Sequence, residues 1–191
     1  MSAFEFFFGF YGLILGLSVV EVITGGARIL KQRRRIRVGY LTPMLALVVL
    51  LDLSGFWSTS WVRYQGIEVS SLLLVVGLAI AGTYFLAASL VFPEDLDAWS
   101  SLDDFYDTHK AWVIGGIWLA KTASHTLLLL VTGKTDVLIS FWTSPPLLAV
   151  VIPLFALMLA VSLVKNHRAN GIMLLLIISA YLTLFIGVTP R

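Results

Sequence analysis

Two ionisable residues lie in the middle of a stretch that is otherwise apolar enough to cross a membrane. The stretch 111–132 carries Lys121 and His125, and Trp118 and Thr122 share their helical face at spacings of three and four residues. Placing a Lys at the centre of a membrane helix costs roughly 2.5–3.5 kcal/mol on insertion scales, so such a residue indicates a functional site or a charged partner. A polar face of this kind belongs inside a helix bundle, away from lipid.

Asp52 is the predicted partner of Lys121. It follows the apolar run Leu-Val-Val-Leu-Leu within the stretch 40–62. With a rise of about 1.5 Å per residue, Asp52 lies roughly 18 Å and Lys121 roughly 15 Å from the same predicted end of the membrane. The two charges therefore lie at similar depth near the midplane, where we expect them to pair.

Three further residues complete the predicted ion or substrate pathway, namely Glu21, Tyr84 and His125. Asp, Glu and His are the groups that proton relays through membranes use, and His changes charge between about pH 5 and 8. In a second interpretation, Lys121 binds an anionic substrate. In the structural alternative, an Asp52–Lys121 pair fixes the helix register and His125 bonds a neighbouring hydroxyl group.

Membrane-spanning helices must position these residues, because the composition is not that of a soluble domain. Of 191 residues, 59% are hydrophobic and 13% are charged, and the mean hydropathy is +0.94; soluble domains average about 45–50% apolar and about 25% charged residues. We predict an all-α fold, a single transmembrane domain over residues 1–191 with short loops and spans of about 20 residues. The six predicted spans are 6–29, 40–62, 69–92, 111–132, 141–164 and 171–188.

The basic residues predict the orientation of the spans. The first loop contains six of the 13 Lys and Arg residues: Arg28, Lys31, Arg33, Arg34, Arg35 and Arg37. Because cytoplasmic loops are rich in Lys and Arg, we expect this loop in the cytoplasm, both termini outside, and a location in the plasma membrane, the inner membrane of a bacterium. The basic run 28–37 is either a topology anchor or a binding site for anionic lipid head groups.

Gly12 and Gly16 in the first span have the GxxxG spacing that lets membrane helices approach closely. This pattern has two interpretations. The glycines either allow close packing within one chain, or they form a seam between two copies in a homo-oligomer.

The loop 93–110 is acidic, and its candidate ligands for a divalent metal are Asp103, Asp104, Asp107 and His109. Their spacing matches no known ligand loop, so we predict no metal site. Ser100 and Asp103 predict a capping box at the start of a short amphipathic helix that leads into the fourth span. We also expect this acidic loop to face the basic run 28–37 across the same side of the membrane.

A weak internal similarity relates the two halves of the chain. Residues 42–49 resemble residues 144–151, and the same offset matches the second and third spans with the fifth and sixth. Since three spans reverse the direction of the chain, this pattern predicts a 3+3 inverted repeat of the kind that occurs in transporters.

The sequence contains no cysteine and no recognisable catalytic or phosphate-binding motif. We therefore predict neither an enzyme nor a cofactor, and the net charge of +2 is too small to indicate binding of nucleic acid. The first prediction for function is a small channel or secondary transporter for protons, ions or a small solute that uses Asp52 and Lys121. The alternative is a non-catalytic membrane scaffold or accessory subunit whose buried charge pair is structural.

Overall fold

The chain folds into six helices in the computed structural model, which describes residues 2–133 and 145–188. In chain order they are α1 (Ala3–Lys31), α2 (Leu41–Tyr64), α3 (Ser71–Ser89), α4 (Leu102–Thr132), α6 (Pro145–Leu163) and α7 (His167–Val188). The predicted all-α fold is confirmed. The predicted fifth span, 141–164, begins at residues that lie outside the described part of the chain.

Five of these helices are long and apolar enough to cross a membrane: α1, α2, α3, α4 and α7. At about 1.5 Å per residue, the 19 residues of α3 span close to the 30 Å of a bilayer core, and the others exceed it. The described apolar stretch of α6, Leu148–Leu163, is shorter. By helix length and composition, the chain is therefore a membrane-embedded protein.

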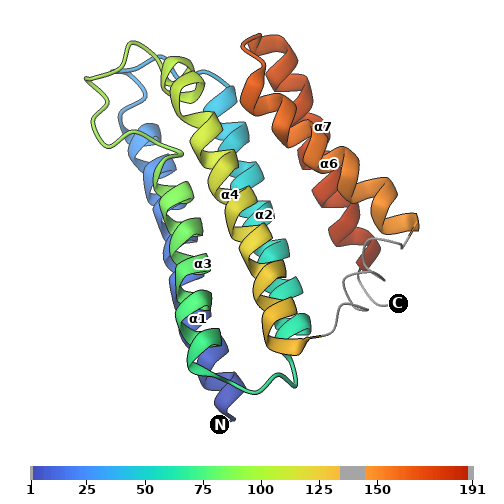
Figure 1. Cartoon of the computed structure of the whole chain (residues 1–191). Helices are drawn as coiled ribbons and strands as arrows, with labels where there is room; N and C mark the ends of the chain where they lie inside the picture. Colours follow the sequence, from blue (N-terminus) through green and yellow to red (C-terminus); the bar gives the residue numbers. More distant parts are fainter. Residues whose placement is uncertain (1, 134–144, 189–191) are drawn as a thin grey trace.

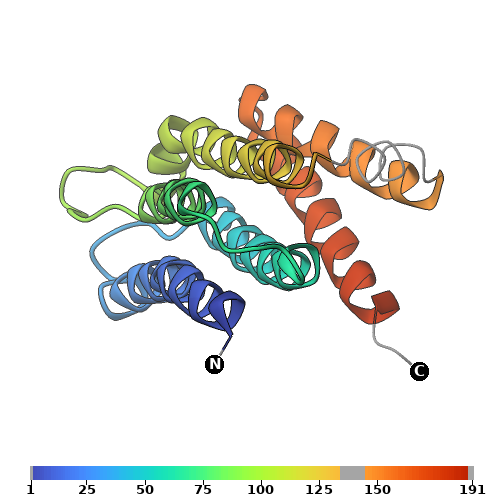
Figure 2. The ribbon, with the colours of Figure 1, turned by 60° about the horizontal axis from the view of Figure 1, so that its bottom comes forward.

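Two groups of helices make up the bundle. The helix α3 packs against both α1 and α4, and α2 packs against α1 and α4 (Figure 2). The pair α6 and α7 lies beside this group, with α7 against α2 and α6 against α4 (Figure 1). Consequently α2 contacts helices of both groups, and its side chains are well placed to join them.

The helix α1 packs on α2 through aromatic rings near the N-terminal end of the bundle. The ring of Phe8 lies 4.6 Å from that of Trp57 and 4.8 Å from that of Trp61, centroid to centroid. A Cβ atom added at Gly12 would lie 1.7 Å from the ring of Trp57, whereas one added at Gly16 would meet nothing within 4 Å. Gly12 therefore serves packing within the chain, and Gly16 does not.

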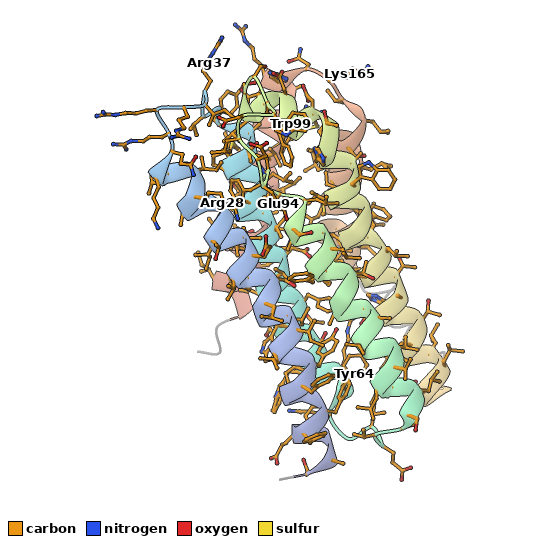
Figure 3. All side chains as sticks on the ribbon, turned by 90° about the vertical axis from the view of Figure 1, so that its left-hand side faces the viewer. Arg28, Arg37, Tyr64, Glu94, Trp99 and Lys165 are labelled. Carbon is orange, nitrogen blue, oxygen red and sulfur yellow. The ribbon has the colours of Figure 1, made fainter. Side chains whose placement is uncertain are left out.

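The opposite end of the bundle is held by a small apolar cluster and by main-chain hydrogen bonds. Ile29 and Ile36 pack with Leu96 and Leu102, which joins the end of α1 to the segment before α4. The amide of Leu102 donates to the carbonyl of Arg37 at 3.2 Å. These contacts bring the basic run and the acidic loop together, as expected, and Figure 3 shows Arg28 beside Glu94 at this end.

The physical basis of that contact differs from the expected attraction of charges. The guanidinium of Arg28 donates to the main-chain carbonyls of Pro93 and Glu94, at 3.2 and 3.3 Å, and not to a carboxylate. Among the described residues, no ion pair joins the basic run to the acidic loop. Exposed ion pairs contribute only about 0–1 kcal/mol, so they do not decide how these loops fold.

The predicted capping box at Ser100 is wrong by one residue. The N-cap of α4 is Ser101, whose hydroxyl group accepts a hydrogen bond from the amide of Asp104 at 3.2 Å. The main chain at Ser101 is bridged to Arg37, which delays the start of the helix. The expected amphipathic helix is the first part of one continuous α4. This helix ends at Thr132 and is capped by Gly133, whose φ of +61° suits glycine.

The packing of the helices lends no support to the inverted repeat. In the first half, α1 packs extensively on α3. Among the described residues, the equivalent pair in the second half, α4 and α7, does not pack extensively, although Lys121 and Tyr181 are in contact. Because Leu-rich and Val-rich helices resemble one another by composition, the repeat stays a prediction from the sequence.

The two glycines of the GxxxG pattern should respond differently to the same substitution. We expect Gly12→Leu to displace the ring of Trp57 and to lower the free energy of unfolding by about 1–3 kcal/mol, the usual cost of overpacking. Gly16→Leu should change neither stability nor oligomeric state. Thermal unfolding and light scattering in detergent measure both. A change of oligomeric state in Gly16→Leu would contradict this assignment and would favour a seam between two copies.

Candidate functional site

A buried carboxylate joins four helices near the middle of the bundle. The Oδ1 atom of Asp52, on α2, accepts hydrogen bonds from Lys121 on α4 and from the hydroxyl group of Tyr181 on α7. The Oδ2 atom accepts a hydrogen bond from the hydroxyl group of Tyr84, on α3, at 2.8 Å. We call these four residues the Asp52 cluster. Each carboxylate oxygen has a partner, so the cluster satisfies a charge that would be costly if left alone.

The predicted pair is confirmed as an ion pair between Lys121 and Asp52. The side chain of Asp52 has no exposed surface, and that of Lys121 is 17% exposed. The ammonium group also donates to the hydroxyl oxygen of Tyr181 at 3.4 Å, and lies 5.6 Å from the ring centroid of Phe155 on α6. These contacts bring α6 to the edge of the cluster as well.

His125 lies next to the cluster but does not reach the carboxylate. Its Nδ1 atom lies 2.8 Å from the main-chain carbonyl of Lys121, one helical turn earlier, and its Nε2 atom lies 3.0 Å from Nη1 of Arg63. A carbonyl group only accepts and a guanidinium group only donates. Nδ1 is therefore the donor and Nε2 the acceptor, which is the arrangement of a neutral imidazole. The hydroxyl partner that the structural alternative gives to His125 is not among these two contacts and stays a prediction.

Glu21 does not join the other predicted residues. It is half-buried on α1, and in the described part of the chain no hydrogen bond or ion pair reaches its carboxyl group. The face of α1 that turns inward carries aromatic, aliphatic and small residues instead. Of the five predicted pathway residues, the structure brings together Asp52, Tyr84 and Lys121, places His125 beside them, and leaves Glu21 apart.

Sequence reasoning missed Tyr181 and Arg63. Tyr181 is the only residue with a polar ring in the stretch 171–188, which is otherwise nearly all apolar. A hydroxyl group at that depth needs a hydrogen-bond partner, and that requirement is the signal that identifies it. Arg63 lies at the end of α2, where a basic residue is expected at a membrane surface, so its contact with His125 has no comparable signal.

A second polar cluster lies at the end of the bundle that carries Lys165 (Figure 3). Asp107, near the start of α4, accepts hydrogen bonds from Lys110 at 3.0 Å and from His167 at 2.6 Å. Lys110 also donates to the carbonyl of Val164. This cluster ties the turn between α6 and α7 to α4.

Three of the four side chains considered for a metal have other partners, and the exception is Asp103, whose Oδ1 atom is buried without a hydrogen-bond partner among the described residues. His109 bonds the main-chain carbonyl of Phe105 through Nδ1, at 3.0 Å, and Asp107 is shared between Lys110 and His167. Asp104 accepts from the hydroxyl group of Ser100. Within residues 2–133 and 145–188, no group of three or more His, Asp or Glu side chains has the arrangement of a metal site.

Comparison of the chain with protein-family models, curated proteins and solved structures gives no match. The class of protein therefore follows from the chain itself. It is a helical membrane protein whose core contains a charge cluster with all its hydrogen-bond partners. Such a cluster can hold helices in register. It can also store a proton if water reaches it.

Removing the carboxylate charge should loosen the whole bundle. We expect Asp52→Asn to lower the free energy of unfolding by about 3–5 kcal/mol, because it leaves the ammonium group of Lys121 without its counter-charge. Ser54→Ala is the matched control on the same helix, since its hydroxyl group only bonds the carbonyl of Leu50 and is exposed. We expect it to change stability by no more than about 0.5 kcal/mol. Unfolding in lipid nanodiscs measures both, and equal stability of the two variants would contradict the clamp.

Proposed function

We propose that this protein is a non-catalytic membrane scaffold or accessory subunit, and that the Asp52 cluster is its structural clamp. One observation carries the proposal: the carboxylate has no exposed surface, and its two oxygens accept three hydrogen bonds from three other helices. A group that must exchange protons or bind a solute needs contact with water or with that solute. A group that fixes the register of helices needs only its partners.

The contacts of the cluster support the same proposal. Tyr84, Lys121 and Tyr181 come from α3, α4 and α7, and each bonds the one carboxylate on α2. Membrane helices gain little from apolar contacts alone, because lipid tails are as apolar as leucine, so hydrogen bonds between helices contribute to their choice of neighbour. The clamp thus gives the bundle one arrangement that a partner protein can recognise.

Apolar side chains on the outside of the bundle provide the surface for such a partner. Leu13 on α1, Leu119 on α4 and Leu175 on α7 are all exposed. These surfaces suit lipid or the apolar face of another membrane helix. The excess of Lys and Arg at the loop after α1 supports a plasma-membrane location, with this loop in the cytoplasm and both termini outside.

Photo-crosslinking in the native membrane tests the scaffold proposal. A photoreactive residue is introduced singly at Leu13, Leu119 and Leu175, with the buried Leu15 as control. We expect one protein adduct of a single mass from one face of the bundle and none from Leu15. Adducts with lipid alone from all three faces would contradict a scaffold that works by binding a partner.

A small channel or transporter is the second candidate, and one observation favours it. The side chain of Lys121 is 17% exposed, and polar side chains continue from it through His125 to Arg63 near the end of α2. Such a row provides donors and acceptors from the midplane toward one surface. Under this proposal Lys121 binds an anion or takes part in a proton relay.

Flux through liposomes separates the two candidates. Purified protein is reconstituted with an internal pH dye, beside Lys121→Met and Asp52→Asn. The scaffold proposal predicts no flux of protons or common ions in any of the three proteins. A flux in the unmodified protein that either substitution alters would favour the channel or transporter and would contradict the clamp as the sole role of these residues.

A further inference from the structure

The turn after α1 forms an open hollow with a strongly basic lining. Its volume is about 750 Å³, and it is lined by Leu30, Lys31, Gln32, Arg33, Arg34 and Arg35. We call it the basic hollow. Four cations around so small a volume create a strongly positive potential, and the volume exceeds that of a single inorganic ion.

The four cations of the basic hollow have no protein counter-charge in the described part of the chain. The ion pairs there involve Lys110, Lys121 and His167 only. The nearby acidic loop leaves the basic hollow uncompensated, because it meets the basic run through main-chain carbonyls and not through carboxylates. An uncompensated group of Arg and Lys side chains favours a phosphate ligand, which guanidinium groups bind through paired hydrogen bonds.

The main chain under these cations is held in place. The amide of Arg35 donates to the carbonyl of Gln32 at 2.8 Å, which closes the turn. On either side of it, Ile29 and Ile36 are buried in the apolar cluster with Leu96 and Leu102. The guanidinium of Arg28 is occupied by carbonyls of the loop before α4, and the main chain at Arg37 is fixed by the hydrogen bond from the amide of Leu102. The basic run is thus divided into two fixed ends and a central set of four free to bind a ligand.

The position of the basic hollow indicates an amphiphilic ligand. Leu30 lies in its lining and is 66% exposed, and Ile23 and Ala27 are exposed on the preceding turns of α1. The cations therefore lie directly above an apolar strip that follows a membrane-spanning helix. A phospholipid has the same order of parts, with a phosphate at the surface and acyl chains below it.

We propose that the basic hollow binds the phosphate of an anionic phospholipid. Lys31, Arg33, Arg34 and Arg35 hold the phosphate oxygens, and Leu30 contacts the start of an acyl chain. This role is independent of whether the protein is a scaffold or a transporter.

Binding of short-chain phosphatidylglycerol to the purified full chain in detergent tests the proposal. Detergent removes the influence of these residues on membrane orientation. We expect tighter binding of phosphatidylglycerol than of phosphatidylcholine, and at least tenfold weaker binding by Arg33→Gln/Arg34→Gln, since juxtamembrane cations each contribute about fivefold. The control Lys165→Gln/Arg168→Gln removes the same charge from exposed positions at the same end of the bundle and should weaken binding less than about twofold.

Two further measurements distinguish a lipid phosphate from a soluble phosphate and control for misfolded variants. Leu30→Gln should weaken binding of the lipid, while inorganic phosphate should bind wild type only weakly and compete poorly. If inorganic phosphate binds as tightly as the lipid, the ligand is a soluble phosphate compound and the lipid proposal is overturned. Arg33→Lys/Arg34→Lys, which keeps the charge, should retain the preference for phosphatidylglycerol. Equal loss in the two Gln double variants, or no preference in wild type, would overturn the proposal.

Discussion

One buried negative charge constrains the rest of this bundle. The carboxylate of Asp52 cannot remain in the membrane interior without donors, and it finds them on α3, α4 and α7. Most side chains around the cluster are apolar, and apolar side chains alone would let these helices rotate or slide against their neighbours. The hydrogen bonds remove that freedom, because a shift by one residue would turn Tyr84, Lys121 or Tyr181 away from the carboxylate.

The two ends of the bundle use weaker contacts around this centre. At one end, aromatic rings of α1 and α2 pack edge to face beside Gly12, and at the other an apolar cluster and main-chain hydrogen bonds close the loops. The second polar cluster, formed by Asp107, Lys110 and His167, attaches the turn between α6 and α7 to α4. The cations of the basic hollow take no part in these contacts. Asp52, Lys121 and Asp107 therefore stabilise the fold, whereas the cations of the basic hollow remain available to bind a ligand. This difference is the basis for assigning them different roles.

The sequence predicts what depends on local geometry and composition. The all-α fold and the pairing of Asp52 with Lys121 follow from hydropathy and from the rise per residue, and both are confirmed. Tyr181 was missed because the neighbour of α2 depends on packing between distant segments. The roles of Gly12 and Gly16 differ for the same reason, since only Gly12 faces Trp57. The cap of α4 shifted to Ser101 because a long-range contact with Arg37 competes with the local capping pattern.

The coupling free energy between Asp52 and Lys121 tests the central claim most directly. The unfolding free energies of Asp52→Asn, Lys121→Met and the double variant are measured in the same lipid nanodiscs. The account predicts that the double variant loses less stability than the sum of the single variants, by at least about 1 kcal/mol, because each single substitution leaves a buried polar group without its partner. Effects that add to within about 0.3–0.5 kcal/mol would show that the two side chains do not stabilise one another, and would contradict the clamp.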